Sequence, residues 1–481
     1  MAAEVSKKTP QMPAQEMHGN VAIVPAVLLT LLLLVCALPR VSQDPELLTI
    51  FIWVFAGMAA WVTWLLRRAK RLKRPLKIEW RPRSQHGLQL LAHATVYSYW
   101  ALNWPQVTQQ LPLILAQVVF AYLFELCLTW HRYGRFWLGF GPIPIVFSTN
   151  LFMWFHDDYF IWQFGLIAVA YLGRECLRWQ RNGINTHIFN PSAFALTAAS
   201  AILIAGGWSH VTWASDIAVT QGRGLFSYES IFAAGLIVQL AFPVVAGTMA
   251  SVLTIVTFDY AYFHVTGQYF FHTTALPIAV FLGMTLLFTD PATSPQGRVA
   301  KGIFGILYAL GVCWLYQALI GLARGEDAGR SLQFYDKLLV VPLLNLLVTP
   351  IETLGSKITA LLRLKWIETK PMHHGLVAIW IVIFALVHHR FDDHPGMAGM
   401  RDDAHYDLAL TPCTRDTFRC YVNCMSDTDQ RNCRRSCLEK MPPERRVQFA
   451  TLVRCMANNA QKDIWGDCVQ AIPGCPPRPA Q

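Results

Sequence analysis

Charged residues are scarce in this chain. Only 15% of its 481 residues are Asp, Glu, Lys or Arg, whereas an average soluble domain carries roughly a quarter. Hydrophobic residues make up 54% and recur in long stretches over most of the length. This composition excludes an ordinary globular protein. It also excludes a chain that is disordered, fibrous or a small disulfide scaffold over its whole length. The composition predicts a polytopic membrane protein. The net charge of +10 does not indicate nucleic acid as a partner, because the position of the basic residues matters more than their total.

Several functional motifs are also missing. The sequence lacks a Walker phosphate loop, a dinucleotide-binding fingerprint and a nucleophile–base constellation, which argues against ATP-driven transport and hydrolysis. We therefore assign no catalytic residue and no metal site. A cleavable signal peptide is not expected either, since residues 1–20 are polar and the first apolar stretch, beginning at Val21, is long enough to be retained as a span.

The apolar stretches predict about 12 or 13 membrane spans, because a spanning helix needs about 20 mostly apolar residues. Residues 88–104 are the weakest candidate, being rich in interfacial Tyr and Trp. The short pair on either side of Pro243 could be half-helices that enter and leave on one side. The remaining candidates are residues 21–38, 46–66, 111–130, 136–155, 159–177, 189–208, 231–245, 246–265, 274–289, 303–323, 334–354 and 375–389.

The basic loops predict the orientation of these spans. The densest basic segment, residues 67–83, is interpreted as a cytoplasmic flank, which places the N-terminus inside. Counting spans from there also places the basic segments 131–135, 174–181, 298–301 and 357–370 inside. Everything after residue 389 is then expected outside.

The tail after residue 389 is polar and rich in cysteine. Two of its cysteine pairs are spaced i, i+4, which predicts two helices joined as an α-hairpin by disulfides. Binding of a metal or redox exchange is the alternative, although no C-x-x-C knuckle is present. The other cysteines are interpreted as small buried residues: Cys36, Cys127, Cys176 and Cys313. The tail holds eight of the 12 cysteines, namely Cys413, Cys420, Cys424, Cys433, Cys437, Cys455, Cys468 and Cys475.

Two short polar motifs interrupt the apolar sequence, at residues 185–192 and 288–295, and their prolines lie 100 residues apart. Asn190-Pro191 and Asp290-Pro291 can each start or break a helix. At membrane depth such breaks persist only where they line a cavity or are buried in protein. Corresponding breaks in two halves indicate a repeat architecture with a site between the halves. Two ordinary loop-to-helix junctions are the alternative.

Residues 281–295, together with Gly297-Arg298 and residues 302–305, resemble the NqrB/RnfD family. This family comprises membrane subunits of the sodium-translocating NADH:quinone reductase and of Rnf-type electron-transport complexes. Residues 188–191 and 343–350 are similar to two further family elements. The resemblance covers roughly residues 90–355. It suggests four parts: a two-span region at 1–84, the family-like core at 85–355, a linker with the last span at 356–390, and the cysteine-rich domain at 391–481.

The resemblance implies an all-α polytopic protein of the bacterial inner membrane with a core of inverted repeats. Such a core holds a flavin and passes electrons within a complex of other redox subunits, without independent catalytic activity. Family members typically carry FMN on the threonine of a Ser-x-Ala-Thr motif, which does not occur here between Thr197 and Gln268. The implied cofactor is FMN or another flavin, without that covalent attachment. A channel or transporter that kept the fold and lost the flavin is the alternative.

The two broken helix starts offer N–H groups and a favourable dipole to an anion, and neighbouring hydroxyl and guanidinium groups add contacts. Asp290 would oppose an anion, so we expect it to cap a helix, and Arg298 could instead be a cytoplasmic flank. Thr273 and Thr274 match a second threonine segment of the family. The candidate cofactor-binding residues are Asn190, Pro191, Thr273, Thr274, Asp290, Thr293, Ser294 and Arg298.

Ionisable residues inside apolar spans are costly and indicate functional sites. Glu125 and Asp259, with His264 and His272 near a membrane end, could relay protons or bind a cation. A satisfied internal hydrogen bond is the alternative for the two carboxylates. The histidine pairs 373–374 and 388–389 flank opposite ends of one span and are interpreted as interfacial residues.

Overall fold

The structure is a computed structural model that describes residues 15–16 and 21–392, apart from residues 182, 225, 267–269, 272–273 and 323–331. Within this part of the chain, five helices are long and apolar enough to cross a membrane. They are compatible with a multi-pass membrane protein, as the composition predicts. With one bent pair of helices counted as a span they number six, so the expectation of 12 or 13 spans is not met in the described residues. These helices are α3 (Pro45–Leu72), α5 (Gln106–Tyr133), α11 (Val245–Thr266), α13 (Arg298–Leu319) and α16 (Lys370–Asp392).

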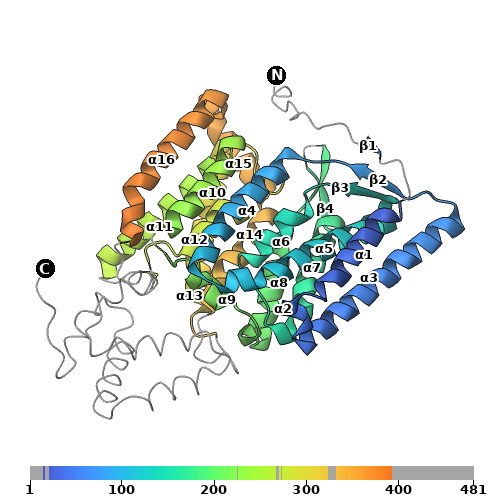
Figure 1. Cartoon of the computed structure of the whole chain (residues 1–481). Coiled ribbons are helices and arrows are strands. Elements are labelled where there is room, and N and C mark those ends of the chain that lie inside the picture. Colours follow the sequence, from blue (N-terminus) through green and yellow to red (C-terminus); the bar gives the residue numbers. More distant parts are fainter. Residues whose placement is uncertain are drawn as a thin grey trace, which may run out of the picture.

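The N-terminal region forms a helical pair at one side of the bundle, opposite α16 (Figure 1). Helix α1 (Ile23–Val35) and α3 pack against each other and against α5, with the short α2 (Pro39–Ser42) between them. Asp44 starts α3 because its carboxylate accepts hydrogen bonds from the N–H groups of Glu46 and Leu47, both at 3.0 Å.

The fold is mostly helical, as expected, and a few short strands accompany the helices. Strand β2 (Lys77–Trp80) pairs in parallel with β3 (Arg135–Leu138) and antiparallel with β1 (Gln15–Glu16). Strands β4 (Arg178–Arg181) and β5 (Ile184–His187) form a hairpin. Strands β2 to β5 lie between helices, and extended pairing satisfies their backbone groups without a helix.

The first half of the core contains α4 (Ser84–Asn103), α5, α6 (Pro142–Asn150), α7 (Ile161–Cys176) and α8 (Pro191–Gly206). The predicted span at 136–155 is wrong, because it divides into β3, the short α6 and an irregular segment. Buried amides satisfy this break. Asn150 donates to Gln117 at 2.6 Å, and Gln163 accepts from the N–H of Phe155 at 3.1 Å.

The second half begins with α9 (Ala214–Thr220) and α10 (Ser227–Ala241), followed by α11. Helix α12 (Ile278–Leu282) continues into the π-helical turn η3 (Gly283–Leu287), after which residues 288–297 form a loop before α13. The predicted span at 334–354 consists of two helices bent by 71°. The remaining elements are η5 (Gln333–Tyr335), α14 (Asp336–Leu346), α15 (Val348–Leu361) and η6 (Leu364–Glu368), with short turns η1 (Asp157–Tyr159) and η2 (Ser209–Val211) in the first half.

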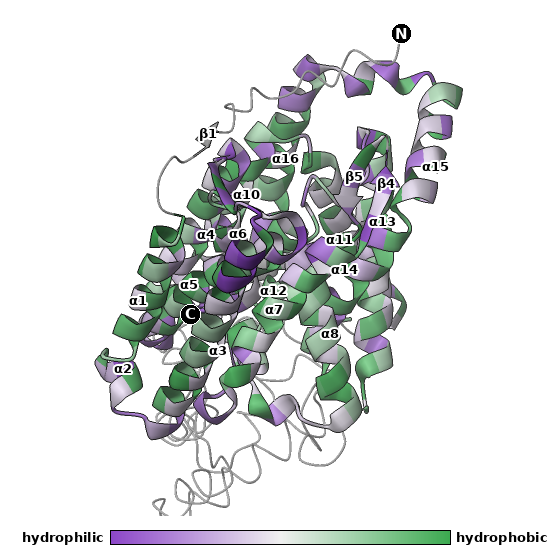
Figure 2. Ribbon diagram, turned by 90° about the vertical axis from the view of Figure 1, so that its right-hand side faces the viewer, coloured by the Kyte–Doolittle hydropathy of each residue, from purple (hydrophilic) through white to green (hydrophobic). Residues whose placement is uncertain are grey.

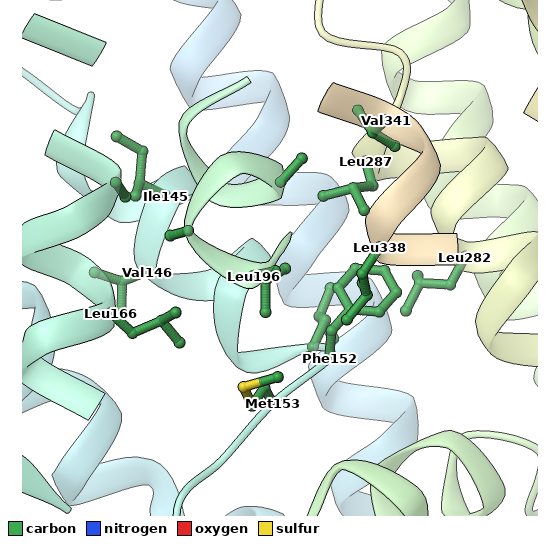
Figure 3. Packing of buried hydrophobic residues seen from close by; sticks show 14 of the residues in the cluster. Ile145, Val146, Phe152, Met153, Leu166, Leu196, Leu282, Leu287, Leu338 and Val341 are labelled. Atoms are coloured by element: carbon green, nitrogen blue, oxygen red, sulfur yellow. The ribbon is translucent and has the colours of Figure 1, made fainter. Parts of the chain in front are cut away.

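The hydrophobic core joins the two halves. Figure 3 shows Val146 and Leu196 of the first half in the same packed region as Leu282 and Leu338 of the second. Hydrophobic residues cover the long helices, whereas hydrophilic residues gather around β4 and β5 (Figure 2). The cysteine-rich tail and its predicted disulfides lie outside the described residues. Of the four other cysteines, Cys176 is exposed, so the expectation of burial is wrong for that residue.

Candidate functional site

The two polar breaks meet in the structure. Asn190 precedes α8 and caps it, because its side chain accepts a hydrogen bond from the N–H of Ala193 at 3.2 Å. Its Nδ2 group also donates to the carbonyl of Leu287 at 2.9 Å, immediately before the 288–297 loop. This contact joins residues 97 positions apart and confirms that the two motifs share one place in the fold.

Asn345 of α14 connects the same two breaks. Its side-chain oxygen accepts the backbone N–H of Asn190 at 3.1 Å, and its Nδ2 group donates to the carbonyl of Thr293 at 3.2 Å. Both asparagines are buried: Asn345 is 1% exposed and Asn190 is 8% exposed. One amide therefore satisfies two backbone groups that the breaks would leave unpaired inside the protein.

Asp290 does not cap a helix, which corrects that expectation. It caps a turn: its Oδ1 accepts the N–H of Ala292 at 3.2 Å and its Oδ2 accepts the hydroxyl of Thr293 at 2.9 Å. The chain continues as turns, and α13 begins only at Arg298, after Gly297 with φ +84°. A second proline at 295 delays the helix because it removes another backbone donor.

His187 lies beside this turn, with its Nε2 3.6 Å from Oδ2 of Asp290. Asp290 lies in the loop, outside the spanning helices. Burial there opposes ionisation, but the hydrogen bond and charge of His187, together with the donors from Ala292 and Thr293, lower the pKa of the carboxyl below its usual value. The carboxylate is thus held in its charged form as part of the turn.

Arg181 holds the loop from the β4–β5 hairpin. Its guanidinium donates to the carbonyls of Ala292 at 3.2 Å and Ser294 at 2.8 Å. It also forms a two-armed ion pair with Glu352 of α15, at 2.5 and 3.4 Å. Glu352 in turn accepts the N–H of Gln296 at 2.5 Å. The hairpin, the loop and α15 are therefore joined at one point.

Two buried polar atoms beside the loop have no hydrogen-bond partner among the described residues: the hydroxyl of Ser294 and Nε of Arg298. Ser294 lines a small pocket of about 10 Å³, with room for about one water molecule, together with Val244, Gly247, Phe288, Thr289, Lys301 and Phe304. A hydroxyl, a guanidinium and an ammonium are donors that a phosphate accepts from. The cavity is smaller than the roughly 300–1,000 Å³ of sites that enclose drug-sized ligands. The chemistry of these donors suits a phosphate, but neither a phosphate nor a flavin fits inside a pocket of this size.

The sequence-predicted residues thus divide into two groups. The fold brings together Asn190, Pro191, Asp290, Thr293, Ser294 and Arg298 around the loop. Thr274 lies before α12, at the other end of a segment on the order of 15 Å long. It is paired with Tyr228 at 3.2 Å. Thr273 and His272 lie outside the described residues.

The intramembrane ionisable candidates have protein partners. Glu125 forms an ion pair with Arg174 at 2.5 Å, and Asp259 accepts the N–H of Phe270 at 2.9 Å. The ion pair engages only Oε1 of Glu125, and its Oε2 is buried without a hydrogen-bond partner among the described residues. Within the described residues, no cluster of three or more potential metal ligands occurs.

Sequence reasoning missed Arg181, Glu352 and Asn345 as members of the site. Arg181 was counted only among the basic flanks, and Asn345 only within a family-like segment. A signal was available for Glu352, since it is an acidic residue close to the end of the apolar stretch 334–354.

Comparison with known proteins reveals no relative: no family model, no curated protein and no solved structure matches this chain.

Proposed function

We propose that this chain is a membrane-embedded electron-transfer subunit of a redox complex in a bacterial cytoplasmic membrane. The observation that carries the proposal is the contact between the two polar breaks, made by Asn190 and bridged by Asn345. Irregular backbone buried between two halves is the usual setting of a site in membrane proteins with repeated architecture. The residues of the second break are those that resemble the NqrB/RnfD family.

The order of elements supports an inverted repeat. In each half, two helices are followed by a short interrupted helix, a further helix, and a last helix that reaches the other half. We assign α4–α8 to one repeat and α10–α14 to the other. The first helices, α4 and α10, pack together, and so do the last, α8 and α14. With the basic loops on the cytoplasmic side, α4 and α10 run in opposite directions across the bilayer.

The residues that would hold a flavin mononucleotide are those with free donors beside the loop. Ser294, Arg298 and Lys301 would bind its phosphate, and Phe288 and Phe304 provide apolar walls. Because the pocket has room for only about one water molecule, neither the phosphate nor the ring would lie inside it. A bound flavin would accept and pass on electrons one or two at a time. The role of the chain is to hold the phosphate, position the ring and limit access of water.

A channel or transporter on the same fold is the second candidate. It is supported by the missing Ser-x-Ala-Thr motif and by the small size of the cavity. The buried amides Gln117, Asn150 and Gln163, which meet at the break after α6, provide polar groups within the first half for such a function.

Flavin analysis of the whole protein separates the two candidates. The protein is purified in mild detergent, and flavin is measured in the native form and after acid denaturation. We expect about one noncovalent FMN per chain, and its loss in Ser294→Val and Arg298→Gln. Ser356→Ala, an exposed hydroxyl on α15, is the matched control and retains the flavin. If neither form contains flavin and added FMN does not bind, the electron-transfer proposal fails, and solute flux in proteoliposomes becomes the relevant assay.

A further inference from the structure

Helix α15 has one packed face and one open face. Its axis turns by 71° from α14, and Figure 2 shows it at the edge of the helical bundle. It packs through Val348, Ile351 and Gly355, which are buried. A Cβ at Gly355 would lie 2.7 Å from that of Ala300 in the first turn of α13. The residues after Gly355 therefore lie at or beyond the end of a spanning helix, where a membrane surface is expected.

The open face combines apolar and basic side chains. We call residues 354–368 the interfacial arm. Leu361, Leu362 and Trp366 are 81%, 60% and 55% exposed. Lys357, Arg363 and Lys365 are exposed as well, and none forms an ion pair with a described residue. Arg363 adopts φ +54°, which ends α15 and turns the chain into η6.

This combination fits the boundary between lipid head groups and acyl chains. Leucines enter the edge of the hydrocarbon, a tryptophan lies at head-group depth, and lysine and arginine meet phosphate. Basic residues close to a membrane end favour anionic phospholipids over neutral ones. An apolar docking partner would leave the three unpaired cations without counter-charge.

The opposite side of the same segment holds the functional loop. Glu352, two residues before the arm, binds Arg181 and the N–H of Gln296. Within the arm, Glu368 accepts the N–H of Arg298 at 2.7 Å, and the guanidinium of Arg298 donates to the carbonyl of Ile367. A change in the position of the arm would therefore act directly on loop 288–298.

We propose that the interfacial arm binds anionic phospholipid head groups and that this binding keeps residues 288–298 in the hydrogen-bonded arrangement described above. The inference rests on the geometry of the arm and not on the presence of a flavin, so the two proposals can fail separately.

The test uses the full chain in phosphatidylcholine nanodiscs that contain a minor fraction of dibrominated lipid, either phosphatidylglycerol or phosphatidylcholine. Bromine quenches nearby tryptophan, and the contribution of Trp366 is the difference between wild type and Trp366→Phe. We expect the anionic lipid to quench Trp366 at least about twofold more than the neutral lipid. The double variant Arg363→Glu/Lys365→Glu should lose this preference. Arg71→Glu, an exposed basic residue of α3, is the control that retains it.

Hydrogen exchange of the loop provides the second measurement. The N–H groups of Gln296 and Arg298 should exchange faster without anionic lipid, and equally fast in the double variant with it. Equal quenching by both lipids would overturn the head-group assignment. No quenching of Trp366 by either lipid would show that the arm contacts water instead. Protection of Trp366 only in a co-purified complex would show that it contacts a partner subunit. Lipid-independent exchange would remove the link between arm and loop.

Discussion

The ion pair between Arg181 and Glu352 makes the sharpest prediction about the site. Their side chains are only 8% and 18% exposed, and Arg181 also satisfies two loop carbonyls. Removing one partner from a buried pair leaves an uncompensated charge, which costs about 3–5 kcal/mol. Because both groups retain some exposure, we expect Arg181→Gln to lower the free energy of unfolding by about 3 kcal/mol.

Reversible unfolding in mixed micelles, followed as SDS is titrated, measures this loss. The double variant Arg181→Gln/Glu352→Gln should be less destabilised than the sum of the single variants, since it contains no unpaired buried charge. Arg135→Gln is the control. Its pair with Glu79 is at 3.4 Å and its side chain is 55% exposed, so the loss should stay below about 1 kcal/mol. If Arg181→Gln costs no more than Arg135→Gln, the hairpin does not hold the loop and the description of the site is wrong.

Three other predictions follow from close packing and hydrogen bonding. Gly305→Ala should destabilise by about 1–3 kcal/mol in the same assay, because a Cβ would collide with the backbone of Gly247; Gly302→Ala on the same helix meets nothing within 4 Å and should be tolerated. Asn345→Leu leaves two buried backbone groups unpaired and should cost about 1–3 kcal/mol for each, with faster hydrogen exchange in the 288–297 loop as the accompanying sign. Because the pKa of Asp290 is lowered in the folded protein, its carboxylate stabilises the fold at pH values above the ordinary carboxyl pKa of about 3.9. This stabilisation is lost as the pH falls through the lower pKa of the folded state. Wild type should therefore lose more stability on acidification than Asp290→Asn.

Local signals were read correctly where short-range physics decides the structure. Asn190 caps the helix that follows it, since a side-chain oxygen before a proline can accept the first free N–H groups. Long apolar runs became helices such as α5 and α13 because every backbone group in lipid must be satisfied within its own segment.

The prediction of spans from hydropathy was less accurate for segments with internal prolines and glycines. The stretch at 136–155 is apolar enough to span but contains Gly139, Gly141 and two prolines, and it breaks into a strand, a short helix and an irregular segment. The break is stable because Gln117, from another helix, pairs with Asn150. Hydropathy measures the composition of one segment and contains no information about a partner on another helix.

The sequence by itself determined the class of protein, most of the helices and the two polar breaks, because composition, apolar run length and capping residues act over short distances along the chain. Only the tertiary structure decided that Asn345 bridges the breaks across 155 residues and that Arg181 finds Glu352 across 171. It also separated Thr274 from the other candidates, since α12 and η3 lie between it and the loop. Burial selects these pairs: a polar group removed from water must find a partner wherever the packed helices place one.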